Sequence, residues 1–86
     1  MIEVKKMNEN EYEVEVSEGG TKSVHQVTVD DGYYNKLTGG RISREELIKK
    51  SFQFLLERES KESILSRFNL KVINRYFPEY EKKIKQ

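Results

Sequence analysis

Three segments near the start of the chain alternate between apolar and polar residues with a period of two: 2–7, 11–18 and 22–29. Such alternation predicts strands that bury one face. A three-residue loop at 8–10 places Val4 opposite Val14 and Lys5 opposite Glu13, and a one-residue slip would destroy both matches. The pattern therefore predicts a three-stranded antiparallel meander in the order 1-2-3.

The second turn of the meander is predicted at Gly19-Gly20, because glycine adopts the positive φ angles of a tight two-residue turn. This turn places Val14 opposite His25, and it places Val24 on the outer face. The predicted core face consists of Ile2, Val4, Tyr12, Val14, Val16, Val27 and Val29.

The rest of the chain follows a helical pattern. Ser43 and Glu46 form the S-x-x-E capping box that opens a helix at about 44–58. Its apolar residues cover an arc wider than a surface helix needs, which indicates a central helix. They are Leu47, Ile48, Phe52, Phe54, Leu55 and Leu56.

Shorter helical pieces are predicted on both sides of this helix. Their predicted N-caps are Asp30-Asp31, Ser60 and Asn69, and Pro78 is predicted in the first turn of the last piece. The piece after Ser60 is predicted to carry Ile64, Leu65 and Phe68. Strands followed by helices predict an α+β fold, with the helices packed on one face of the sheet. We expect a single domain over 1–86, with the meander at 1–30 and the helical part at 31–86.

Composition excludes several kinds of site. The chain has no cysteine and one histidine, so it contains neither a zinc-thiolate site nor an HExxH motif. We therefore expect no metal, no cofactor and no enzymatic activity. No apolar run approaches the roughly 18 residues of a membrane span, and no signal peptide opens the chain. We expect a soluble, cytoplasmic protein without a membrane partner.

Three features in or near the meander have two interpretations each. His25 is expected to be a structural residue at the margin of the core, with metal binding or catalysis as the alternative. Glu11, Glu13 and Glu15 form a row with a spacing of about 6.7 Å, typical of a solvated face or of a cation site. Gly39-Gly40-Arg41, just before the Ser43 cap, is expected to be a plain turn, with anion binding as the alternative.

Basic residues gather in the second half of the chain. Residues 1–40 have a net charge of −4 and residues 41–86 a net charge of +5. Pairs four residues apart on a helix, such as Glu45 with Lys49, compensate part of this charge. The basic residues without such a partner are Arg41, Arg44, Arg67, Lys71 and Arg75. With the aromatic cluster around Tyr76, which we otherwise assign to the core, they are the candidates for nucleic-acid contact.

The segment 42–80, ISREELIKKSFQFLLERESKESILSRFNLKVINRYFPEY, resembles a group of short uncharacterised prokaryotic proteins with a hairpin-rich front and an "ILSRF…YFPEY" tail. This resemblance implies the same order of elements and assigns no activity. The order of a small antiparallel sheet before helices is also similar to HicB-type antitoxins, which implies a regulator. The Pro- and Gly-bearing segment typical of those sheets is missing here.

The sequence favours a non-catalytic protein-interaction module. The strand at 22–29 is a predicted edge with little charge and an outward Val24, and such an edge invites pairing. The predicted contact residues are Val24, Gln26 and Thr28, and the simplest partner is a second copy in a two-fold homodimer. A nucleic-acid-binding or antitoxin-like regulator that uses the basic helical half is the alternative, and an enzyme ranks third.

Overall fold

Three antiparallel strands form the N-terminal part of the protein. In the computed structural model, which describes residues 1–85, they are β1 (Ile2–Lys6), β2 (Glu11–Glu18) and β3 (Thr21–Thr28). Residue 86, the last of the predicted helical part, lies outside the described residues. Val4 lies opposite Val14, Lys5 opposite Glu13, and Val14 opposite His25. The predicted register is therefore confirmed in both hairpins.

The turn between β2 and β3 is formed by two glycines in the left-handed region. Gly19 has φ 58° and Gly20 has φ 79°. Positive φ at both central positions is the property of a type I′ turn, whose twist matches that of the strands. The predicted Gly-Gly turn is thus confirmed, and it fixes which residues of β3 face the core.

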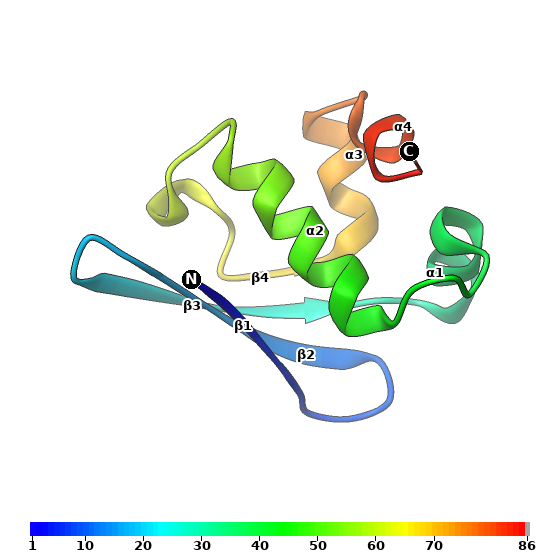
Figure 1. Cartoon of the computed structure of the whole chain (residues 1–86), viewed down its shortest axis with the longest axis horizontal. Helices are drawn as coiled ribbons and strands as arrows, with labels where there is room; N and C mark the ends of the chain where they lie inside the picture. Colours follow the sequence, from blue (N-terminus) through cyan, green and yellow to red (C-terminus); the bar gives the residue numbers. More distant parts are fainter. Residues whose placement is uncertain (86) are drawn as a thin grey trace.

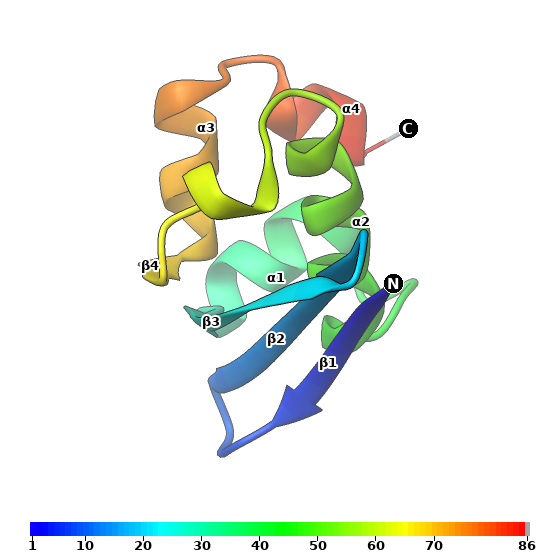
Figure 2. The same cartoon turned by 90° about the vertical axis from the view of Figure 1, so that its left-hand side faces the viewer.

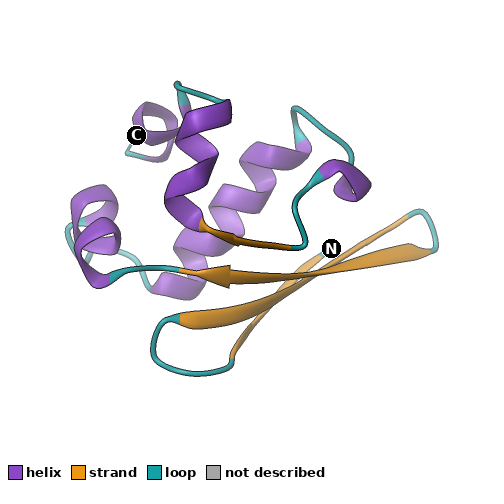
Figure 3. Ribbon diagram, turned by 180° about the vertical axis from the view of Figure 1, so that it is seen from behind, coloured by secondary structure: helices purple, strands orange, loops and turns teal. Residues whose placement is uncertain are grey.

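The sheet has a fourth strand that the sequence does not predict. β4 (Arg67–Asn69) lies parallel to β3, beside Gln26–Thr28, in the sheet order β1-β2-β3-β4 (Figure 3). The helix predicted after Ser60 is wrong beyond its first turn. Only the 3₁₀ turn η1 (Lys61–Ser63) forms, and the chain then runs extended.

Contacts with β3 explain this extended path. The Nδ1–H of His25 donates to the carbonyl of Leu65 over 2.8 Å, and the N–H of Gln26 donates to the carbonyl of Ser66 over 2.8 Å. A helix through these residues would turn the same carbonyls along its own axis. The expectation of an open β3 edge is therefore wrong for its second half, which the protein's own chain covers.

The helices lie together on one face of the sheet, as Figures 1 and 2 show. They are α1 (Asp31–Thr38), α2 (Arg44–Leu56), α3 (Ile73–Tyr76) and α4 (Tyr80–Ile84), with the 3₁₀ turn η2 (Leu70–Val72) leading into α3. This arrangement is the predicted α+β class. Within the described residues, none of the helices has both the length and the apolar character needed to cross a bilayer.

α2 is the central helix. The Ser43 hydroxyl accepts from the N–H of Glu46 over 3.0 Å, and the Glu46 carboxylate accepts from the N–H of Ser43 over 3.4 Å. Both halves of the predicted capping box are therefore present. The helix ends two residues earlier than predicted, where the N–H groups of Arg58 and Glu59 both donate to the carbonyl of Leu55.

The core lies between α2 and the inner face of the sheet. Five of the predicted core-face residues are buried, and Ile2 and Val4 at the β1 edge are half-buried. Phe52 of α2 is fully buried, with its ring centroid 5.4 Å from His25 and 6.0 Å from Phe68. The long-range contact through Phe68 attaches the β4 segment to the core and places this segment beside α2.

Candidate functional site

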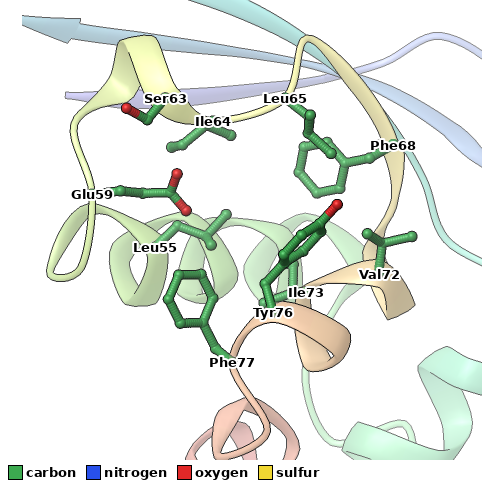
Figure 4. A pocket seen from close by; sticks show the side chains of 10 residues that line it. All are labelled: Leu55, Glu59, Ser63, Ile64, Leu65, Phe68, Val72, Ile73, Tyr76 and Phe77. Atoms are coloured by element: carbon green, nitrogen blue, oxygen red, sulfur yellow. The ribbon is translucent and has the colours of Figure 1, made fainter.

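An apolar groove lies between the end of α2, the extended segment after η1, and α3 (Figure 4). We call it the α3 groove. Its lining residues come from these three segments and are Leu55, Glu59, Ser63, Ile64, Leu65, Phe68, Val72, Ile73, Tyr76 and Phe77. Its cavity volume is about 250 Å³. The three segments are brought together by contacts of the fold rather than by closeness in sequence.

The floor of the α3 groove belongs to the core. Leu55, Ile64, Phe68 and Ile73 line it, and all four are buried. Phe68 packs on Phe52, and the extended backbone around Phe68 holds it beside α3. These contacts make the floor a rigid apolar surface, because closely packed side chains have few alternative positions.

Two large apolar side chains stand on the rim. Leu65 is 48% exposed and Tyr76 is 67% exposed. Leu65 points outward because Ile64, its neighbour on the extended chain, points into the core. Tyr76 lies three residues after the buried Ile73, at the last position of α3. An apolar cavity with exposed apolar residues at its rim is typical of a contact surface.

The pattern of the sequence does not predict this groove. The pattern predicts a short helical piece after Ser60 that carries Ile64, Leu65 and Phe68, and it assigns Tyr76 to the core. The signal in the sequence is the high number of large apolar residues between 64 and 77. The structure buries part of this set and leaves Leu65 and Tyr76 exposed.

His25 has a structural position, as the sequence analysis expects. It is 2% exposed and packs on Phe52. The Leu65 carbonyl can only accept, so His25 Nδ1 carries a proton, and Nε2 accepts from the Ser23 hydroxyl over 2.8 Å. Both ring nitrogens are therefore engaged, and the ring attaches the rim segment of the groove to β3.

The predicted contact residues on β3 have different surroundings. Val24 is 46% exposed and precedes the part of β3 that β4 covers. Gln26 and Thr28 pair with β4, and the Gln26 side chain accepts from the Arg67 guanidinium over 2.8 Å. Val24 therefore remains available for contact, while the backbone of Gln26 and Thr28 is already used.

The acidic row of β2 lies on the outer face of the sheet. Glu15 forms an ion pair of 3.6 Å with Lys22, and Glu13 lies opposite Lys5. Within residues 1–85, no group of three or more acidic or histidine side chains is arranged to hold a metal ion. Glu11, Glu13 and Glu15 are thus a row of half-buried residues, in which Glu13 and Glu15 have basic neighbours and Glu11 accepts from the Asn8 side chain.

Four of the five basic residues without a helical partner contact other groups of the protein. Arg44 forms an ion pair with Asp31 and donates to the Val29 carbonyl over 2.8 Å. Lys71 lies 3.8 Å from Asp30. The remaining three are Arg41, which donates to the Thr38 carbonyl, Arg67, which donates to Gln26, and Arg75, which is exposed on α3.

In the turn before α2, backbone and side-chain N–H groups donate to carbonyls of α1. Gly39 ends α1 with φ 61°, and its N–H donates to the carbonyl of Asn35 over 2.8 Å. The Arg41 Nε donates to the Thr38 carbonyl over 3.1 Å, and the Arg44 guanidinium lies 4.8 Å from the Tyr34 ring centroid. The Arg41 guanidinium thus bonds within the turn, and the Arg44 guanidinium packs on α1. These contacts fit the interpretation of Gly39-Gly40-Arg41 as a plain turn.

No family model, curated protein or solved structure matches the chain. The two resemblances drawn from the sequence therefore stay predictions, and the function is argued from the geometry of the α3 groove.

Proposed function

We propose that the protein is a non-catalytic interaction module and that it binds a partner protein in the α3 groove. The observation that carries this proposal is the apolar cavity with Leu65 and Tyr76 exposed beside it. Exposed apolar side chains that gather at an apolar groove mark a contact site, and a tyrosine loses little conformational freedom when it is covered.

The size of the groove supports a protein partner. Its volume of about 250 Å³ is below the roughly 300–1,000 Å³ of sites that enclose a small molecule. It suits a large side chain of a partner, which is how central residues of protein interfaces bind. A rigid floor favours such binding, because little has to be ordered on association.

Selection of random displayed peptides tests this proposal. We expect peptides that bind the wild-type protein and lose binding to Leu65→Lys, which places a charge on the rim. Met7→Lys is the matched control, because Met7 is 52% exposed and lies in the β1–β2 hairpin, outside the groove. Peptides that bind wild type and Leu65→Lys equally would overturn the proposal.

A Val24→Lys variant separates the groove from the edge of β3. Loss of binding in Val24→Lys alone would place the contact on the strand edge that the sequence predicts, and would contradict the groove. Light scattering of the purified protein tests the second-copy partner. A dimer that Leu65→Lys dissociates would identify the partner as another copy of this chain.

A further inference from the structure

One carboxylate lines the α3 groove, and it belongs to Glu59. Glu59 follows the end of α2, and its N–H donates to the carbonyl of Leu55 over 2.9 Å. Its side chain is half-buried and points into the cavity, on the side away from Tyr76 (Figure 4). The carboxylate therefore faces the space that an occupant would fill.

The cations nearest to Glu59 in the sequence are engaged elsewhere. Arg58 pairs with Glu79 over 3.1 Å and with Glu57 over 3.3 Å. Lys61 is buried and pairs with Glu62 over 2.7 Å. Across residues 1–85, the Glu59 side chain has no such ion pair or hydrogen bond. Its neighbouring cations thus pair with other carboxylates, and its own half-buried carboxylate lines the groove without such a partner among the described residues.

The free energy of filling the groove depends on the charge of the occupant. An apolar group alone would remove water from the Glu59 carboxylate and leave this charge without compensation, which is costly. An acidic group would add repulsion. A cation beside the apolar group would replace the lost hydration, and its attraction to the carboxylate is stronger where water is excluded.

The geometry points to an occupant of defined chemistry: a peptide segment of the partner that carries a large apolar side chain next to a lysine or arginine. This inference rests on the proposed function above. The apolar side chain contacts Leu55 and Ile73 on the floor, and the ammonium or guanidinium group pairs with Glu59. Leu65 and Tyr76, on the other side of the cavity from Glu59, then cover the large apolar side chain.

Parallel peptide selections on wild type, Glu59→Lys and Glu9→Lys test the inference. We call peptides groove-dependent when they bind wild type and lose binding to Leu65→Lys. We expect such peptides, selected on wild type, to be enriched in Lys or Arg beside a large apolar residue. Glu59→Lys should select Asp or Glu at the same place. Glu9→Lys has the same charge change in the exposed β1–β2 loop and should select as wild type does.

A double-mutant cycle with one selected synthetic peptide measures the pairing itself. Replacing the basic residue of the peptide by Gln should weaken binding to wild type by about threefold to tenfold, and should have no effect on binding to Glu59→Gln. Melting curves of Glu59→Gln and Glu59→Lys check that both variants are folded, which is expected because the Glu59 side chain forms no hydrogen bond or ion pair within residues 1–85.

The outcomes separate this inference from the proposed function. Groove-dependent peptides without basic enrichment, or a cycle without coupling, would overturn the choice of a basic occupant while the interaction module stands. A selection that yields no peptide sensitive to Leu65→Lys would overturn both. Enrichment that reverses with Glu59→Lys would support both.

Discussion

The hydroxyl of Tyr80 is buried between α2 and α4, bonded to the Ser51 hydroxyl over 2.6 Å. Because Ser51 donates its own proton to the Leu47 carbonyl over 2.7 Å, Tyr80 is the donor to Ser51. Burial raises the pKa of Tyr80 above the ordinary tyrosine value, since a tyrosinate would lose its hydration. The folded protein therefore binds this proton more tightly than the unfolded chain.

This shift predicts a loss of stability at alkaline pH. The contribution of Tyr80 is fully present below the unfolded tyrosine pKa of about 10, and it is lost as the pH rises from there toward the higher folded pKa. In Tyr80→Phe, we expect stability to fall less steeply above pH 10 than in wild type. At pH 7 the variant should be less stable by about 1 kcal/mol, because Ser51 loses its donor.

Urea denaturation between neutral pH and about pH 11 measures this difference. Tyr76→Phe is the matched control, because the Tyr76 side chain is exposed and its hydroxyl lies outside the core. An equal dependence of stability on pH for wild type and Tyr80→Phe above pH 10 would show that burial does not raise the pKa of Tyr80.

At the scale of elements, the attachment of β4 to β3 depends on His25. The imidazole bonds to the Leu65 carbonyl, and the next bond, from the Gln26 N–H to Ser66, begins the pairing with β4. In His25→Phe, which keeps an aromatic ring against Phe52, we expect a loss of about 1–2 kcal/mol in the free energy of unfolding. The amide of Gln26 should also exchange faster with solvent, because the segment after η1 opens locally.

Hydrogen exchange measured by NMR checks this prediction. The amide of Ser17 is the internal control, because it donates to the Met1 carbonyl on the opposite side of the sheet. Unchanged exchange at Gln26 in a destabilised His25→Phe variant would mean that packing of Phe68 alone holds β4 in place.

The elements differ in how well the sequence predicts them, and the reason is the range of the interactions that form them. The hairpins follow from alternation and from Gly19-Gly20, and α2 follows from its capping box, all of which are local signals. β4 is three residues long, too short to show alternation. It forms through His25, whose partner Leu65 is 40 residues away.

The candidate site is less predictable than the fold for the same reason. The apolar residues of the α3 groove are visible in the sequence, but a helical pattern accounts for them equally well. Only the extended path after η1 turns Ile64 inward and Leu65 outward. Fewer of the predicted contact residues on β3 are available in the structure, because Gln26 and Thr28 pair with β4 and only Val24 remains exposed.

At the scale of the whole molecule, the distribution of charge bears on nucleic-acid binding. Arg44 and Lys71 lie beside Asp31 and Asp30, so their positive charges are partly compensated. We expect no binding to duplex or single-stranded nucleic acid tighter than about 10 μM near physiological salt. Gel shifts at two salt concentrations measure this. A tight, salt-dependent complex that is lost when Arg67, Lys71 and Arg75 are all replaced by Ala would establish the alternative function.

The affinity of one selected peptide for three forms of the protein tests the central claim most directly. Fluorescence anisotropy gives the Kd for wild type, Leu65→Lys and Met7→Lys. A contact in the α3 groove predicts a Kd at least about tenfold weaker for Leu65→Lys, as for central interface residues, and an unchanged Kd for Met7→Lys. Equal affinity for all three forms, or an equal loss in both variants, would contradict a binding site in the groove.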